Sequence, residues 1–310
     1  CLAISFIRND SWMIGALIFA NIVQAIAFAF SRPANKAIIT ELVEKDELVL
    51  YNSRLELVLQ VVSVSSPVLS FLVLQFASLR ITLVLDALSF FLAFGLVALL
   101  PKKEEKALGE KKLTFKVIFS DIKEGVHYIV KQKEIFFLLV MASSVNFFFA
   151  AFNYLLPFSN QLYGVQGAYA TILIMGAIGS IVGALLASKI KASMEKLLLL
   201  LALTGLGVMI MGFNLPSYLA FSGNFICELF MTIFNIHFFT QVQTKVEGEY
   251  LGRVLSSIYT LAILFMPIAT GLMTWLSSVH LYSFLIIGLG VVILSFLALG
   301  YVRTHFKKEI

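Results

Sequence analysis

One acidic residue lies deep inside an otherwise apolar part of the sequence. Glu228 is near the middle of residues Ser217–Thr244, which contain no other Asp, Glu, Lys or Arg. A charged carboxylate at the centre of a membrane helix costs about 2.5–3.5 kcal/mol on insertion scales. Such a site favours the neutral acid and makes proton uptake near neutral pH possible. Glu228 therefore either binds and releases a coupling proton, pairs with a cationic substrate, or stays protonated as a hydrogen bond between helices.

Only a few other side chains in the apolar segments could carry charge. Asp86 is the one other acid well inside such a segment, about two turns from Arg80, and is a second proton-coupling candidate with a structural role as the alternative. His237 is expected to be a packed or interfacial histidine rather than a proton relay. The two cysteines, Cys1 and Cys227, are too few for a disulfide scaffold or a cysteine metal site.

Motifs of the common enzyme classes are absent from the sequence. It contains no His-Glu-x-x-His, no phosphate-binding Gly-Lys-Ser/Thr loop and no nucleophile elbow. The sequence therefore predicts no enzyme, no cofactor and no metal site, and it argues against an ATP-driven pump within this chain.

The elements that must position these residues are membrane-spanning helices. Residues AVILMFWYC make up 60% of the 310 positions and charged residues only 13%, about half the share of a soluble domain. A membrane helix needs about 20 apolar residues, and helices satisfy their own backbone groups in lipid. We predict an all-α polytopic membrane protein with nine spans, and Cys1–Ile7 as the end of a tenth. The nine are Ser11–Ser31, Leu57–Leu79, Ile81–Leu100, Ile135–Pro157, Ala168–Ser188, Leu197–Phe213, Ser217–Thr244, Val254–Leu276 and Leu281–Val302.

Basic residues between the spans predict the orientation. If the loops alternate sides, Arg8 and Arg80 are the only Lys or Arg on the outer side, and the other 21 of 23 lie inside. The central loop and the C-terminus are therefore expected to be cytoplasmic, in a bacterial cytoplasmic membrane. The net charge of +5 is explained by this asymmetry and does not indicate nucleic-acid binding. Residues 101–134 form a linker in which Leu113–Val130 is predicted to be an amphipathic helix on the inner membrane surface.

A weak internal repeat appears at a shift of 200 residues. Ile39-Thr40-Glu41-Leu42 aligns with Phe239-Thr240-Gln241-Val242, and Pro67 aligns with Pro267. Both prolines are expected to kink their helices. Halves related in this way are typical of transporters built from parallel repeats. The repeat predicts twelve helices, of which nine and part of a tenth lie here, with the others preceding Cys1. It divides the chain into residues 1–100 (N-terminal bundle), 101–134 (linker) and 135–310 (C-terminal bundle).

Three segments carry a resemblance to a known family. They are Ser31-Arg32-Pro33-Ala34-Asn35-Lys36-Ala37, Leu85-Asp86-Ala87-Leu88-Ser89-Phe90 and Gly252-Arg253-Val254-Leu255-Ser256. Together with the helix count and the basic central loop, they resemble the major facilitator superfamily, in the branch of macrolide-efflux proteins and the enterobactin exporter. The resemblance covers nearly the whole chain, from the end of the third helix of that fold.

The resemblance implies which side chains line a central cavity. In that fold, the helices at Ser11–Ser31, Ile135–Pro157 and Ser217–Thr244 surround the substrate path, and polar faces on them should point inward. The implied cavity-lining residues are Asn21, Gln24, Phe28, Asn146, Asn153, Asn224, Met231 and Asn235. Arg54, Glu56 and Arg253 at inner helix ends are candidates for gate-closing ion pairs, with static capping as the alternative.

These observations predict a secondary transporter. The expected function is proton-coupled efflux of drugs or amphipathic small molecules by alternating access, by a chain that works as a monomer when complete. The expected partners are the substrate, protons and the lipid bilayer, with no nucleic acid. Two alternatives remain: an exporter or facilitator of one physiological compound such as a siderophore, and an inactive truncated remnant.

Overall fold

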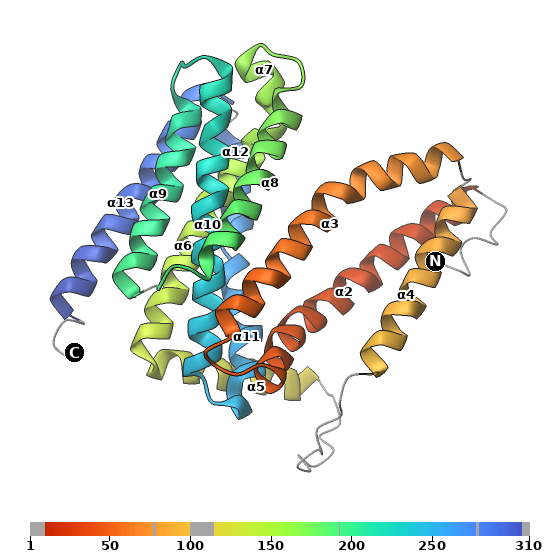
Figure 1. Cartoon of the computed structure of the whole chain (residues 1–310), viewed down its shortest axis with the longest axis horizontal. Coiled ribbons are helices and arrows are strands. Elements are labelled where there is room, and N and C mark those ends of the chain that lie inside the picture. Colours follow the sequence, from red (N-terminus) through yellow and green to blue (C-terminus); the bar gives the residue numbers. More distant parts are fainter. Residues whose placement is uncertain (1–9, 77–78, 100–114, 192, 277–278, 306–310) are drawn as a thin grey trace. The chain divides into compact units, whose positions relative to one another are not determined.

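The computed structural model describes residues 10–76, 79–99, 115–191, 193–276 and 279–305. All regular elements in these ranges are helices, which confirms the predicted all-α fold (Figure 1). The elements are α2 Asp10–Leu42, α3 Leu48–Phe76, α4 Leu79–Ala98, α5 Phe115–Lys131, α6 Lys133–Leu155, the 3₁₀ turn η1 Leu156–Phe158, α7 Ser159–Tyr163, α8 Ala168–Ala187, α9 Met194–Gly212, α10 Ser217–Lys245, α11 Gly248–Ile263, α12 Met266–Leu276 and α13 Leu281–His305.

The helices agree in order with the predicted membrane spans. Within the described ranges, eight segments are long and apolar enough to cross a bilayer, and each overlaps one predicted span. The ninth prediction, Leu57–Leu79, falls on α3, whose 29 residues extend about 43 Å at 1.5 Å per residue. The predicted helix end at Cys1–Ile7 lies outside the described residues.

The chain forms two compact units. Unit 1 comprises residues 1–35 and 63–121, and unit 2 comprises residues 36–62 and 122–310. In unit 1, apolar side chains such as Phe19, Phe91 and Phe94 are exposed, as expected of helices that meet lipid tails. The division into halves at residues 100 and 134 remains a prediction from the internal repeat.

Unit 2 is a helix bundle centred on α10. Helix α10 packs against α8 and α9, α13 packs against α9, and α6 packs against α11, α12 and α13 (Figure 1). Glycines allow these helices to approach closely, as small residues do in membrane bundles. A methyl group added at Gly179 or Gly183 of α8 would overlap the backbone carbonyl oxygen of Phe225 or Leu229 of α10. The small-residue face of α8 is therefore a packing surface for α10.

The predicted span Val254–Leu276 is interrupted in the structure. Helix α11 ends at Ile263 and α12 begins at Met266, with Pro267 as its second residue. Proline has no N–H to donate and its ring crowds the carbonyl four residues earlier, which is Ile263 here. The interruption therefore falls where the proline prevents continuous helical bonding. Pro67 falls within α3, and its side chain lies outside the described set.

The linker contains the helix α5, close to the amphipathic helix predicted at Leu113–Val130. Its second half packs against α11: the rings of Tyr128 and Tyr250 stack with centroids 5.0 Å apart. At Gly125 there is no space for a side chain, because a Cβ there would lie 2.5 Å from the backbone oxygen of Arg253. Ser257 of α11 also donates to the Ile122 carbonyl at 3.3 Å. This half of α5 is thus fixed to α11 by direct contacts.

Candidate transport site

Glu228 lies at the interface of α10 and α8. Its side chain is half-buried, and the hydroxyl of Ser180 on α8 donates to Glu228 Oε2 at 3.3 Å. Ser180 itself is 2% exposed. The glycine face of α8 brings the two helices close enough for this contact, since Gly179 and Gly183 flank Ser180. Among side chains that the structure describes, no cation forms an ion pair with Glu228.

The other polar residues predicted on this face of α10 have different surroundings. Asn224 is 3% exposed, and its Nδ2 donates to the backbone oxygen of Ile172 on α8 at 2.8 Å. Met231 is half-buried and Asn235 is exposed. The face predicted from sequence is therefore divided: its Asn224 end packs against α8, and its Asn235 end is open.

His237 is fixed by a hydrogen bond to the backbone. It is 5% exposed, and its Nε2 lies 3.0 Å from the carbonyl oxygen of Ala187 at the end of α8. A carbonyl oxygen can only accept, so the proton of this bond is carried by Nε2. This contact agrees with the packed histidine expected from sequence.

The remaining cavity candidates lie in both units. In unit 1, Asn21 is exposed and donates to Leu17 O of its own helix at 2.9 Å, Gln24 is half-buried, and Phe28 is 49% exposed. In unit 2, Asn146 is half-buried and Asn153 is exposed, both on α6. Their convergence on one cavity remains a prediction.

Asp86, the second proton-coupling candidate, lies in unit 1. Its side chain is exposed on α4, and its backbone oxygen accepts a hydrogen bond from Ser89 Oγ at 2.7 Å.

A polar cluster that sequence reasoning missed joins the ends of α2 and α3 to α10. Lys36 Nζ donates to Asn52 Oδ1 at 3.2 Å, and Asn52 Nδ2 donates to Gln243 Oε1 at 2.7 Å and to Thr240 Oγ1 at 3.2 Å. Gln243 Nε2 completes the ring by donating to the Lys36 backbone oxygen at 2.8 Å. The Lys36 ammonium also lies 5.1 Å from the centroid of the Phe239 ring. Asn52 and Gln243 are 1% and 2% exposed.

This polar cluster gives a specific stability prediction. Replacing Asn52 by Ala should lower the free energy of unfolding by about 1–3 kcal/mol, because it leaves buried partners without a hydrogen bond. Thermal unfolding of the purified protein in detergent micelles measures the loss. Asn52→Ala and Gln243→Ala should be non-additive because they remove the same bond, whereas Asn52→Ala and the control Asn235→Ala should add. Additive effects of Asn52→Ala and Gln243→Ala would contradict the direct contact.

The predicted gate residues have local partners. Arg253 pairs with Glu124 of α5 at 2.8 Å, and Glu56 accepts a hydrogen bond from Gln60 of its own helix at 2.9 Å. Arg54 is exposed. A further ion pair joins Lys245 at the end of α10 to Glu134 at the start of α6. The Lys245–Glu134 pair lies at helix ends, whereas Glu124 lies in the middle of α5.

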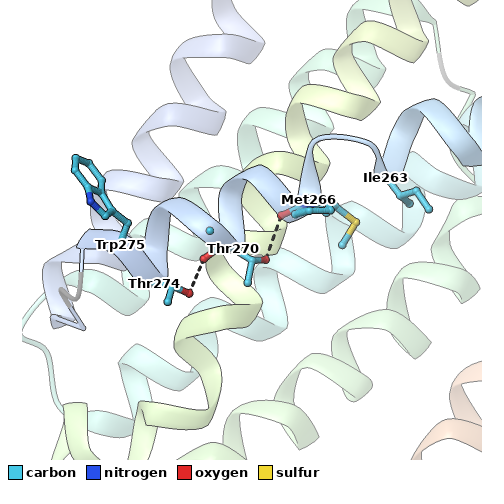
Figure 2. A pocket seen from close by; sticks show the side chains of 7 residues that line it. Ile263, Met266, Thr270, Thr274 and Trp275 are labelled. Carbon is cyan, nitrogen blue, oxygen red and sulfur yellow. Dashed lines mark hydrogen bonds between the residues drawn. The ribbon is translucent and has the colours of Figure 1, made fainter.

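An open groove runs along the interrupted helix. Its volume is about 780 Å³, and Figure 2 shows most of its lining side chains. Thr270 and Thr274 donate to the backbone oxygens of Met266 and Thr270 at 3.1 and 2.9 Å, as the dashed lines mark. Because these hydroxyl protons are used within the helix, the groove is largely apolar. It is lined by Ile263, Met266, Pro267, Thr270, Gly271, Thr274 and Trp275.

Comparisons with known proteins agree with this picture. Residues 1–262 match the family model described as Major Facilitator Superfamily. The chain is 27% identical over 275 residues to Macrolide efflux protein A of Enterococcus faecalis, covering 83% of this chain and 80% of that protein. It is also 27% identical over 274 residues to Macrolide efflux protein A of Streptococcus pyogenes, covering 83% of this chain and 64% of that protein. No solved structure matches the chain.

Proposed function

The chain belongs to the Major Facilitator Superfamily, and from that premise we propose that it is an exporter of the macrolide-efflux type, which moves amphipathic small molecules in exchange for protons. The protein is a multi-pass membrane transporter with a small-molecule substrate. The proposed energy source is the proton gradient, and the proposed proton site is Glu228. Alternating access would expose this site first to one side of the membrane and then to the other.

The observation that carries the proposal is the position of Glu228. It is an acid in the middle of a membrane helix, with a serine hydroxyl as its partner and no ion pair among the described side chains. An ionised carboxylate in this position costs free energy, whereas the neutral carboxylic acid does not. Proton uptake therefore lowers the free energy of Glu228 between the helices. Acids of this kind mark proton and substrate pathways in membrane proteins.

We propose macrolide antibiotics as substrates, as the names of the two relatives suggest. A macrolide is a large and mostly apolar lactone, so it needs apolar surface more than many hydrogen bonds. The open groove beside Pro267 and Trp275 offers apolar surface of the kind that such a molecule needs.

The polar cluster of Lys36, Asn52, Thr240 and Gln243 is the proposed inner latch. It joins a segment before the linker to α10, with bonds between residues 188, 191 and 207 positions apart in sequence. Separation of α10 from α2 and α3 during transport would break these three hydrogen bonds together. Lys36 could then turn to Glu56, which interacts with it electrostatically.

We also propose that the protein lies in the cell membrane with its C-terminus and linker in the cytoplasm. The support is the asymmetry of Lys and Arg between the two sides.

Export by the full chain in a macrolide-sensitive bacterium tests the function. Cells that express it should accumulate less labelled macrolide than cells with an empty vector, and a protonophore should remove the difference. Loss of the difference upon sodium removal, with no effect of the protonophore, would overturn proton coupling. Equal accumulation in both strains, with the protein present in the membrane, would overturn macrolide export.

A further inference from the structure

One buried polar atom on the same helix face as Glu228 has no hydrogen-bond partner among the described residues. Asn224 Nδ2 donates to the Ile172 carbonyl at 2.8 Å, but Asn224 Oδ1 accepts no hydrogen bond from any described residue. The side chain is 3% exposed, so water does not reach this oxygen freely. A buried acceptor without a donor costs free energy, and such an atom calls for an explanation.

The orientation of the Asn224 amide is set by its contact. The Ile172 oxygen can only accept, so the NH₂ group must face it and the carbonyl Oδ1 must face elsewhere. Rotating the amide would place two oxygens against each other. The unpaired atom is therefore an acceptor.

Glu228 is a neighbouring group that becomes a donor when it is protonated. It follows Asn224 by four residues, one helical turn along the same face. The two side chains border the same space at Gly176 of α8: a Cβ built there would overlap Asn224 Nδ2, and it lies 3.1 Å from Glu228 Cγ and 3.3 Å from Asn224 Cγ. The Ser180 hydroxyl donates to Glu228 and is not available to Asn224. Only a protonated Glu228 adds a donor to this set.

We propose that Asn224 is a positioning residue for proton binding: its Oδ1 accepts a hydrogen bond from the protonated carboxyl group of Glu228. The inference rests on the proposed role of Glu228 as the proton site. Uptake of a proton adds one O–H, which satisfies the orphan oxygen. On release the proton leaves along the transport path, Ser180 still donates to the carboxylate, and Asn224 Oδ1 again lacks a donor.

The two neighbours of Glu228 therefore favour opposite protonation states. Ser180 donates to the ionised form and stabilises it, whereas Asn224 accepts from the neutral form and stabilises that. Removing the Asn224 acceptor should shift the pH at half-maximal transport downward. Removing the Ser180 donor should shift it upward.

Other ionisable groups around Glu228 are few. Cys227 is adjacent in α10, and Glu56 of α3 interacts electrostatically with Glu228. Helix α8 contributes no charged residue and only Tyr169, at its start. The charges on α9 and α11, which also pack against α10, lie within their first two turns, at Glu195, Lys196, Glu249 and Arg253. Lys36 of α2 lies over the Phe239 ring of α10.

The test uses a pair of variants of nearly equal shape. Asn224→Val removes the acceptor, and Asn224→Thr keeps a hydroxyl that can accept. We expect Val to lower the pH at half-maximal macrolide transport by on the order of one unit. Asn224→Thr should show little of this shift. Ser180→Ala should raise the pH at half-maximal transport. Asn214→Val is the matched control with no expected shift, because Asn214 is exposed in the turn between α9 and α10.

A second readout does not depend on transport. Infrared difference spectra of the purified protein should show the C=O band of protonated Glu228, absent in Glu228→Gln, at lower frequency in the original chain than in Asn224→Val. An unchanged band would overturn the role of Asn224 alone. Equal pH profiles of Asn224→Val and Asn224→Thr would do the same, provided that Glu228→Gln abolishes the pH dependence. Unchanged pH dependence in Glu228→Gln would overturn the proposed proton site itself.

Discussion

Replacing Glu228 by Gln is expected to abolish transport driven by a pH gradient. The amide has the shape of the carboxyl group, and its oxygen can still accept the hydrogen bond from Ser180. It can neither take up nor release a proton at physiological pH, so the cycle loses its coupling step. We expect the pH-driven component of macrolide export from vesicles to fall to the level of vesicles without the protein, while substrate binding is retained.

Two further variants make the Glu228 result specific. Glu247→Gln removes an exposed acid just beyond the end of α10 and should leave pH-driven export intact. Asp86→Asn tests the second acid that the sequence places within a span. Export that survives in Glu228→Gln but is lost in Asp86→Asn would move the proton site from unit 2 to unit 1. Because Asp86 is exposed and Glu228 contacts α8, we expect the reverse.

The helices were predictable because the bilayer permits so few kinds of secondary structure. Long uncharged segments can only be helices there, and the turn-forming residues between them, such as Asn214 to Ser217, mark their ends. The structure places α9 at Met194–Gly212 and α10 from Ser217, which agrees with that reading. The sequence indicated a kink at Pro267. It did not indicate that the span is divided there into two helices.

Side-chain partners were much harder to predict. The spacing of Asn224, Glu228, Met231 and Asn235 indicated a common face, but periodicity does not say which neighbouring helix covers which part. In the structure, Gly176, Gly179 and Gly183 of α8 meet α10 at the level of Glu228. The division of the polar face follows from this contact.

The polar cluster around Asn52 left no usable signal in the sequence. Asn52 lies in a charged segment between two spans, and Gln243 follows a long apolar run, so each is ordinary in its own surroundings. Their hydrogen bond joins positions 191 residues apart. Contacts over such distances depend on how whole helices pack, and a single sequence contains no local pattern for them.

The second large effect is expected from the glycine face of α8. Replacing Gly179 by Ala should destabilise the protein by about 1–3 kcal/mol, because the added methyl group overlaps the backbone oxygen of Phe225 and a backbone cannot turn away as a side chain can. Gly300→Ala on α13 is the matched control, since no atom lies within 4 Å of a Cβ there. That control should be neutral or slightly stabilising, as Ala exceeds Gly in helix propensity by about 1 kcal/mol.

The same substitution should also affect proton coupling. Forcing α8 away from α10 lengthens the contact between Ser180 and Glu228, which is already 3.3 Å. Thermal unfolding in detergent micelles measures the stability change, and the pH profile of export measures the effect on Glu228. We expect the unfolding temperature of Gly179→Ala to fall and its pH profile to move in the direction of Ser180→Ala. A stable Gly179→Ala protein with an unchanged profile would mean that α8 and α10 are not in the close contact on which the candidate site depends.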